Sequence, residues 1–303
     1  MPRRKALIEK GADGNWNATT WAEYWQAVRD LAKGLIELGL APGQSALLVG
    51  ANRRDWVISQ FGVSAASGVP APIYATNTVD QVAHIANNCE APIAICDDET
   101  QVAKFLGARS RGLIKLDHII TMDAIGSDSD IVISLSDVIA RGRAASDQEL
   151  DCRLAAVNPE NLALLIYTSG TTGVPKGAMY THAGIDAISK SAIETYPELQ
   201  EIDPARYISY LPLCHAAEQC FTNFLSLRNG AETYFCPEIT DIKDYLIAAR
   251  PHLFFAVPRV WEKFEAALAS NFAQATGGKA KLLDWARGVE LRSFERGLET
   301  GRP

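Results

Sequence analysis

Residues 161–182 read NLALLIYTSGTTGVPKGAMYTH, and this stretch decides which fold the sequence predicts. It opens with a continuous apolar run, 162–166, bounded by polar residues as is typical of a buried strand. Only hydroxyl-bearing residues and glycines follow Tyr167: Thr168, Ser169, Gly170, Thr171, Thr172 and Gly173. Glycine permits positive φ and close backbone approach, so this loop can turn several N–H groups toward one ligand. Lys176 adds an ammonium group, and amides with one cation suit the phosphates of a nucleotide.

The loop differs from the two common glycine-rich phosphate motifs. The Walker motif has Gly before its Lys and Ser or Thr after it, whereas Pro175 precedes Lys176 and Gly177 follows it. No G-x-G-x-x-G occurs in the sequence. Over its whole length the loop resembles the signature loop of the adenylate-forming superfamily, which includes acyl-CoA synthetases, luciferases and the adenylation domains of peptide synthetases. A solvated linker is the alternative, but it leaves the apolar strand before the loop unexplained.

The composition is that of an ordinary globular protein. The chain has 303 residues, 48% of them hydrophobic and 21% charged, with a net charge of −7. The acidic balance argues against nucleic-acid binding through overall charge. No apolar run approaches the ~20 residues of a membrane span, which leaves only peripheral membrane contact open. The six cysteines form no C-x-x-C pair and lie mostly among apolar residues, which indicates reduced thiols in a cytoplasmic protein.

Segments typical of strands and of helices alternate along most of the chain. The patterns predict strands over 45–49, 69–74, 93–96, 118–121, 162–166, 207–211, 232–235 and 253–257. They predict helices over 20–39, 52–66, 78–88, 183–196 and 242–249, after His215, and from 258 onward. Such alternation favours an α/β fold with doubly wound, mostly parallel sheets and helices on both faces. The polar, turn-rich residues 123–160 predict a surface connection.

Local signals also predict where some of these elements begin and lie. Thr20 and Glu23 have the spacing of a capping box, and Asn52 and Thr78 are expected to begin the second and third helices. Pro70 and Pro72 cannot donate to a strand ladder, so the strand over 69–74 is expected at a sheet edge.

Two later stretches narrow the resemblance to one branch of the superfamily. Residues 210–218 read YLPLCHAAE, which is similar to the LPLxHxxE segment of fatty-acyl-CoA ligases of the long-chain type. Residues 255–263 read FAVPRVWEK, which is similar to a VPRVWEK segment of the same branch. The resemblance starts at about Trp16, so residues 16–303 are identified as an AMP-binding N-terminal domain.

This resemblance implies an ATP-dependent, AMP-forming reaction in two steps. A fatty-acid carboxylate attacks the α-phosphate of ATP, which gives an acyl-adenylate and pyrophosphate, and the thiol of coenzyme A then displaces AMP. The loop residues 168–173 are expected to bind the β- and γ-phosphates, and Lys176 to neutralise their charge.

Three further residues are candidates for the substrate site. The resemblance places His215 beside the acyl pocket, near the carboxylate and the α-phosphate. Glu218 lies three residues later on the same helical face, and Arg259 follows Pro258 at a strand-to-helix turn that suits phosphate or carboxylate. From the residues alone, the alternatives are a core histidine, a solvated helix charge and a surface salt bridge. A zinc site of Cys214, His215, Cys220 and Cys236 fits no standard spacing, so no metal site is predicted.

Parts that the family's activity needs do not occur in these 303 residues. They are a Y-G-x-T-E segment, whose glutamate holds Mg²⁺, a T-G-D segment, whose aspartate binds ribose, and the small C-terminal catalytic domain. The resemblance therefore implies an incomplete synthetase, inactive alone, with an exposed sheet edge that promotes self-association. Two alternatives stay open. One is a non-catalytic remnant, or one half of a split enzyme completed by a second polypeptide, that binds nucleotide or acyl chains. The other is a fatty acyl-AMP ligase that loads a carrier protein.

Overall fold

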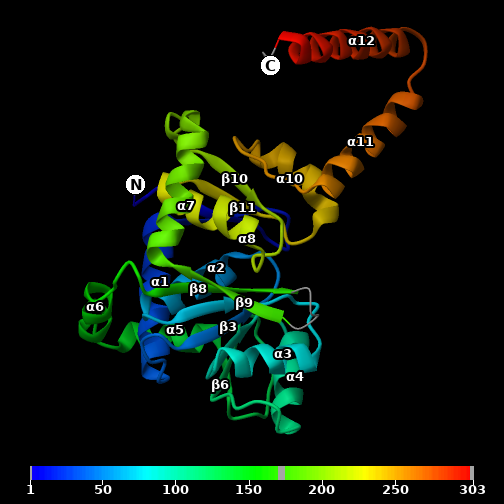
Figure 1. Ribbon diagram of the computed structural model, residues 1–303. Coiled ribbons are helices and arrows are strands. Elements are labelled where there is room, and N and C mark those ends of the chain that lie inside the picture. The colour runs from blue at the N-terminus through cyan, green and yellow to red at the C-terminus, as the bar shows by residue number, and fades with distance from the viewer. Residues whose placement is uncertain (1, 170–174, 301–303) are drawn as a thin grey trace. The chain divides into compact units, whose positions relative to one another are not determined.

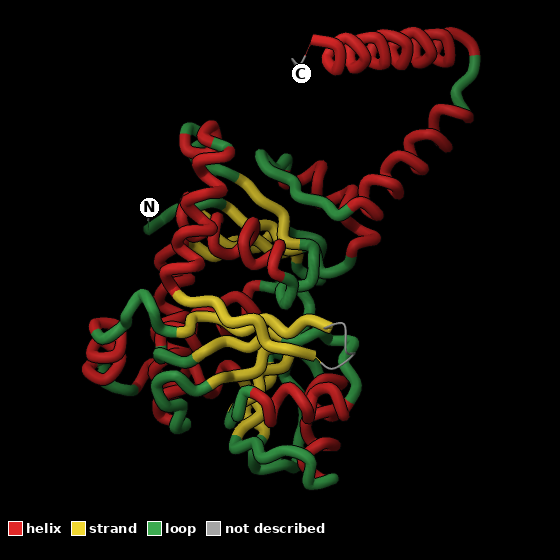
Figure 2. Tube along the Cα trace, in the orientation of Figure 1, coloured by secondary structure: helices red, strands yellow, loops and turns green. Residues whose placement is uncertain are grey.

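The computed structural model of the chain describes residues 2–169 and 175–300 (Figure 1). The backbone divides into two compact units, Met1–Phe254 and Phe255–Pro303. The first unit contains a five-stranded sheet, a four-stranded sheet and a two-stranded hairpin, whose strands are drawn in yellow in Figure 2.

All strands of the larger sheet run parallel, in the order β4-β3-β5-β6-β7. They are β3 (Ser45–Val49), β4 (Val69–Pro72), β5 (Ile93–Cys96), β6 (His118–Thr121) and β7 (Val132–Ser134). The helices around them are α1 (Trp21–Glu37), α2 (Arg54–Ala65), α3 (Val79–Asn88), α4 (Glu99–Ser110) and α5 (Leu135–Ala144). Parallel strands need crossover connections: α2 lies between β3 and β4 in the chain, α3 between β4 and β5, and α4 between β5 and β6.

Side chains of the larger sheet enter two separate hydrophobic clusters. Leu48 and Ile95 belong to a cluster with residues of α1, α2 and α5. Leu47 and Ala94 belong to a cluster with residues of α3 and α4. Because successive residues of a strand point to opposite faces, helices cover both faces of this sheet, as Figure 1 shows. The predicted doubly wound α/β architecture is confirmed.

The prolines of β4 lie at the edge of the hydrogen-bonded ladder, as predicted. Val69 and Ile73 donate their N–H groups to carbonyls on the β3 side, over 2.8 and 2.9 Å. The alternate positions Pro70 and Pro72 would direct an N–H away from β3, so the ladder loses no bond there.

The second sheet has the order β10-β11-β1-β2 and includes two strands that the sequence patterns did not predict. β10 (Arg206–Ser209), β11 (Glu232–Phe235) and β1 (Lys5–Lys10) are parallel, and β2 (Trp16–Thr20) pairs antiparallel with β1. β1 precedes Trp16, where the resemblance begins, yet it lies between β11 and β2 with Ala6, Leu7 and Ile8 buried. The folded domain therefore starts before residue 16. The short helix η3 (Ile239–Asp241) and α10 (Ile242–Ala249) follow β11.

Residues 123–160 contain regular structure that their polar composition did not predict. β7, α5 and α6 (Gln148–Ala155) all lie in this segment. Leu135, Val138 and Leu150 are buried in the cluster that includes α1. The segment is part of the core and not merely a surface connection, because a few apolar residues suffice to bury short helices against a larger one.

Thr20 and Thr78 cap α1 and α3, and both helices have complete capping boxes. Asn52 does not cap α2. Arg53 occupies the N-cap position and makes no side-chain capping bond with any residue that the structure describes. The Asn52 side chain is instead buried and bonded to the second sheet.

The second unit consists, in its described part, of the helices α11 (Pro258–Ala273) and α12 (Gly277–Thr300). Residues 253–257 form no strand, although all of them are described. A short apolar run has the same sequence pattern whether or not a partner strand lies beside it, which explains the wrong prediction. Within residues 2–169 and 175–300, the helices are all too short or too polar to cross a membrane.

Candidate functional site

A hairpin of β8 (Leu162–Ser169) and β9 (Pro175–Thr181) carries the glycine- and hydroxyl-rich loop. The strands pair antiparallel, with Thr168 opposite Lys176 and Ser169 opposite Pro175. Gly170, Thr171, Thr172 and Gly173 lie outside the described residues. Directly opposed residues project from the same face of a sheet, about 5 Å apart. Thr168 and Lys176, both exposed, therefore project from the same face of the hairpin, close to where the loop leaves and rejoins it.

Contacts from α3 hold the loop end of this hairpin, and sequence reasoning missed the residues that make them. The Tyr167 hydroxyl donates to Asn88 Oδ1 over 2.7 Å, and burial raises the pKa of Tyr167 well above its ordinary value. His84 Nε2 lies 3.2 Å from the carbonyl oxygen of Pro175. A Cβ on Gly177 would lie 3.2 Å from the Tyr167 ring, so glycine at 177 lets the ring pack across the hairpin. The available sequence signal for this close packing was Gly177, the residue without a side chain that follows Lys176.

His215 lies at the N-cap of α8 (Ala216–Glu218), after β10. Its Nδ1 accepts a hydrogen bond from the Ala217 N–H at 3.2 Å. A ring nitrogen that accepts carries no hydrogen, so in the neutral ring Nε2 carries it. The half-buried imidazole thus presents Nε2–H as a donor, which suits a carboxylate or a phosphate oxygen.

The segment before His215 is fixed from the other sheet by Asn52. Asn52 Nδ2 donates to Ser209 Oγ over 2.8 Å and to the Leu211 carbonyl over 2.7 Å. Asn52 is buried, so these bonds form away from water and lose little to competition with it. A residue just after β3 therefore sets the path of the chain just after β10.

Past α8 the helix continues as η2 (Gln219–Phe224), a π-helical segment, and then as α9 (Leu225–Asn229). Gln219 and Gln60 of α2 exchange two amide hydrogen bonds of 2.7 and 2.8 Å. Gln219 Nε2 also donates to the Leu213 carbonyl over 2.5 Å, and Asn223 donates to Gln219 over 3.3 Å. These amides are buried and mutually satisfied, so they fix the π-helical segment beside His215.

Glu218 and Cys214 flank His215 in the sequence and are both buried. Glu218 is 3% exposed, and burial raises its pKa to about 7 despite hydrogen bonds from neighbouring groups. Its Oε1 has no hydrogen-bond partner among the described residues. Burial raises the pKa of the Cys214 thiol to about 12, so that thiol is not a nucleophile at neutral pH.

A narrow apolar crevice lies between the hairpin, α7 (His182–Thr195) and the helix after His215. Its volume is about 10 Å³, roughly the space of one water molecule. Its walls come from β8, β9, α7, α8 and η2: Leu164, Ile166, Tyr180, Ile185, Ile188, Ala216, Gln219, Cys220 and Phe224. Ala216, which lines the crevice, is the residue after His215, and Leu164 and Ile166 line it from β8.

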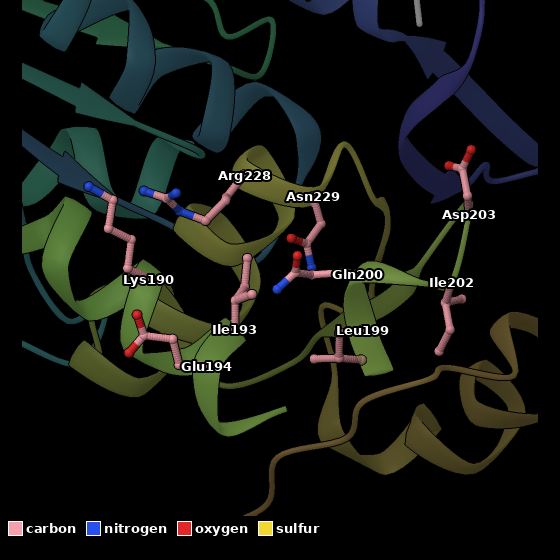
Figure 3. A pocket seen from close by; sticks show the side chains of 9 residues that line it. All are labelled: Lys190, Ile193, Glu194, Leu199, Gln200, Ile202, Asp203, Arg228 and Asn229. Carbon is pink, nitrogen blue, oxygen red and sulfur yellow. The ribbon is translucent and has the colours of Figure 1, made fainter. Parts of the chain in front are cut away.

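A larger pocket of about 590 Å³ lies at the other end of α7, between that helix, η1 (Pro197–Gln200) and α9. In Figure 3, Lys190 and Arg228 lie toward one end and Asp203 toward the other. Lys190 and Arg228 both pair with Asp186, and Asp203 pairs with Arg4. Its lining, as far as the structure describes it, includes none of the predicted site residues. The charges of Lys190, Arg228 and Asp203 are already paired, so we place the candidate site at the loop and His215 and not at this larger pocket.

Arg259 belongs to the second unit, where it is exposed in the first turn of α11 after Pro258.

Among the described residues, no three His, Cys, Asp or Glu side chains lie close enough together to hold a metal ion.

Known proteins resemble this chain in sequence. A family model described as AMP-binding enzyme matches residues 1–294. The long-chain-fatty-acid–CoA ligase ACSBG2 of Xenopus laevis is 33% identical over 307 residues, covering 98% of this chain and 41% of that protein. The human ACSBG2 ligase is 30% identical, covering 95% of this chain and 43% of that protein. The chain thus spans less than half the length of these curated relatives.

Solved structures resemble it in fold. A long-chain-fatty-acid–CoA ligase (FadD1) from Archaeoglobus fulgidus superimposes with a TM-score of 0.72 at 20% identity, covering 90% of this chain and 51% of that one. ATP-bound MatB from Rhodopseudomonas palustris superimposes with a TM-score of 0.70 at 21% identity, covering 86% and 48%. At such identity the likeness establishes a shared architecture.

Proposed function

The chain belongs to the AMP-binding enzyme family, and from this premise we propose that it takes part in ATP-dependent activation of a fatty acid and its transfer to coenzyme A. The single observation that carries the proposal is the hairpin, which sets Thr168 beside Lys176 at the two ends of the glycine- and hydroxyl-rich loop. The similarity to long-chain-fatty-acid–CoA ligases supports a fatty acid as the substrate.

The loop is proposed to hold the triphosphate of ATP. The hydroxyls of Thr168, Ser169, Thr171 and Thr172 and the amides of Gly170 and Gly173 would bind the β- and γ-phosphates. Lys176 would neutralise the negative charge that grows on the departing pyrophosphate. Because Lys176 is exposed at the hairpin edge, its ammonium reaches a ligand without breaking a described ion pair. A basic residue at this place acts by charge and position, not by proton transfer.

His215 is proposed to orient the reacting groups. Its Nε2–H would donate to the fatty-acid carboxylate or to an α-phosphate oxygen, which holds them in line. A carboxylate oxygen then forms a bond to the α-phosphorus while the bond to pyrophosphate breaks, which yields the acyl-adenylate. In the second step the coenzyme A thiol attacks the acyl carbon, and AMP leaves with the bonding electrons. Arg259 is proposed to bind phosphate or carboxylate in these steps.

Mg²⁺ is the usual companion of ATP in such chemistry, and it is commonly held by one or two carboxylates together with the phosphates. The described residues offer no cluster of metal-binding side chains, so no step here is assigned to a protein-held metal. Of the six free cysteines, three are buried, two are half-buried and one is exposed, which fits the proposed reducing, cytoplasmic setting.

Fatty-acid-dependent exchange of labelled pyrophosphate into ATP tests the proposal. Because the resemblance implies a chain inactive alone, we expect ATP binding in equilibrium dialysis that requires Lys176, whether or not the chain catalyses exchange. Replacing palmitate by a short polar acid should remove the acyl-dependent signal. If the folded chain binds neither ATP nor palmitate, the proposal fails. Supplying coenzyme A or an acyl carrier protein after adenylation then identifies the thiol that accepts the acyl group.

A further inference from the structure

Two polar side chains of α3 bond the hairpin at the end that carries Lys176. The Nε2 atom of His84 lies 3.2 Å from the carbonyl oxygen of Pro175. The Oδ1 atom of Asn88 accepts a hydrogen bond from the Tyr167 hydroxyl over 2.7 Å. We propose that His84 and Asn88 are positioning residues, which hold this end of the hairpin from α3 and so fix where Lys176 lies. Only the consequence for ATP binding rests on the proposed function.

The two bonds reach residues next to the pair that is proposed to bind phosphate. Thr168 pairs with Lys176 across the hairpin, and Tyr167 pairs with Gly177. Tyr167 directly precedes Thr168 in β8, and Pro175 directly precedes Lys176 in β9. Each strand is therefore held one residue away from the Thr168–Lys176 pair, so neither strand can shift there without breaking a bond to α3.

The Tyr167 side chain and the Thr168–Lys176 pair lie on opposite faces of the hairpin. Successive side chains of a strand point to opposite faces, so Tyr167 and Thr168 project in opposite directions. Tyr167 belongs to the hydrophobic cluster with residues of α3 and α4, whereas Thr168 and Lys176 are exposed. The packing with α3 therefore leaves the exposed face of the hairpin open to a ligand.

The helix that carries the two side chains is itself held in place. A complete capping box fixes the first turn of α3. His84 and Asn88 are four residues apart, so they lie about one turn apart on the same face of the helix. The buried residues of α3 belong to the same hydrophobic cluster as Tyr167: Val82, Ala83, Ile85 and Ala86. Both bonds to the hairpin thus start from backbone that has little freedom to move.

The contact with Pro175 assigns the hydrogen on the His84 ring. A carbonyl oxygen only accepts hydrogen bonds, so Nε2 of His84 carries a hydrogen, and in the neutral ring Nδ1 carries none. A glutamine side chain can place an amide N–H near the position of Nε2, whereas leucine has no donor. His84→Gln is for this reason the conservative replacement and His84→Leu the disruptive one.

Isothermal titration of the full chain with ATP tests whether His84 acts through Lys176. We expect His84→Leu to weaken ATP binding by about threefold to tenfold, because the ammonium is displaced and not removed. His84→Gln should restore most of the affinity. In a chain that also carries Lys176→Ala, His84→Leu should change the affinity by less than about twofold, since no ammonium is left to position.

The neighbouring asparagines of α3 give a matched pair of variants. Asn88→Ala removes the acceptor of the Tyr167 hydroxyl and should weaken ATP binding, as His84→Leu does. Asn87→Ala also removes one side-chain hydrogen bond, in which Asn87 Nδ2 donates to the Leu113 carbonyl over 2.8 Å. That bond does not reach the hairpin, so Asn87→Ala should leave ATP affinity unchanged.

Two further measurements need no ATP. Nitrogen-15 NMR of the histidine side chains should show a hydrogen on Nε2 of His84 in the parent chain. Amide hydrogen exchange of residues 175–178 should be about threefold to tenfold faster in His84→Leu than in the parent chain, because one bond that opposes local opening is lost. Exchange in His84→Gln, and exchange of residues 45–49 of β3 in all variants, should match the parent chain.

Unchanged exchange of the hairpin in a folded His84→Leu chain would overturn the proposal. So would a loss of ATP affinity on His84→Leu that is as large with Lys176→Ala as without it. If His84→Leu does not fold, Asn88→Ala measured against Asn87→Ala decides in its place. If the parent chain binds no ATP, the proposed function fails, while hydrogen exchange still decides whether α3 holds this end of the hairpin.

Discussion

At the scale of single residues, burial decides the chemistry of the groups around His215. Glu218 and Cys214 are ordinary side chains whose pKa values rise to about 7 and about 12 because the charged form is poorly solvated. Lys176 is exposed and keeps its charge available to a ligand. The candidate site thus combines an accessible cation at the loop with shielded groups that hold a histidine in place.

Replacing Lys176 tests the role of that cation. We expect Lys176→Ala to weaken ATP binding by about tenfold to a hundredfold, which corresponds to a charge-assisted hydrogen bond of about 1.5–3 kcal/mol. Isothermal titration with ATP at two salt concentrations measures the change. Lys190→Ala removes the same charge from the exposed end of α7, where it pairs with Asp186 over 2.6 Å, and should leave ATP affinity unchanged. Equal losses in both variants would show a general charge effect.

Glu218 also predicts how stability depends on pH. A carboxyl with a raised folded-state pKa binds its proton more tightly in the folded protein. Its unfavourable contribution is absent below its ordinary value of 4.5 and complete above about 7, where it reaches about 3 kcal/mol. The free energy of unfolding should therefore fall, through this group, as pH rises from 4.5 to 7.

Urea unfolding of the parent chain and Glu218→Gln at pH 5 and pH 8 measures this contribution. Other groups titrate in the same range, and taking the difference between the two proteins removes their shared effect. The parent chain should lose more stability than Glu218→Gln over this interval. Parallel pH profiles would mean that Glu218 does not change its protonation on folding.

At the scale of elements, the close crossing of α1 and α5 joins the segment 123–160 to the core. A Cβ on Gly142 would lie 1.7 Å from the Asp30 carbonyl oxygen, and one on Gly34 would lie 2.2 Å from the Val138 carbonyl oxygen. Backbone atoms cannot move aside as a flexible side chain can. Glycine at these positions is what lets the two helices pack at backbone distance.

Alanine at this crossing should separate the helices. We expect Gly142→Ala to lower the free energy of unfolding by about 3 kcal/mol or more, in the upper range for overpacked cores. Gly107→Ala is the matched control, because Gly107 lies inside α4 with nothing within 4 Å of its added Cβ. There alanine should stabilise by about 0.5–1 kcal/mol through helix propensity. Thermal unfolding of both variants separates the two effects, and equal melting temperatures would show that α1 and α5 readjust freely.

At the scale of the whole molecule, the large hydrophobic clusters lie in the first unit, and several large apolar side chains of the second unit are exposed. Both large hydrophobic clusters are formed by residues of the first unit. In the second unit Leu282, Trp285 and Phe294 are 61%, 63% and 65% exposed. Apolar side chains so exposed favour association with other surfaces.

A chain that ends at Phe254 tests this division. We expect it to unfold cooperatively, with a melting temperature within a few degrees of that of the full chain, because the clusters remain intact. Sedimentation velocity over a range of concentrations should show that the full chain self-associates more strongly than the shortened one. If the shortened chain associates equally, the exposed apolar side chains of the second unit are not the surface through which the full chain associates.

Much of the fold follows from local sequence signals. Thr20 with Glu23 and the β-edge prolines Pro70 and Pro72 act through neighbouring backbone atoms, so their outcomes were predictable. The strand before the loop was predictable from its continuous apolar run. Its last residues, Thr168 and Ser169, were expected in the loop, because the pairing with β9 that extends the strand cannot be read from 162–166 alone.

Other features depend on residues far apart in the sequence, and only the tertiary structure decided them. Asn52 had the residue type of a helix cap, yet it bonds Ser209, which is 157 residues away. Glu218 had the pattern of a solvated helix charge, yet the packing around it leaves it 3% exposed. Sequence alone determined the apolar strand that leads into the candidate phosphate-binding loop and the alternation of strands and helices, since those depend on neighbours. Burial and long-range pairing depend on what the rest of the chain brings alongside, and they decided how His215 is held.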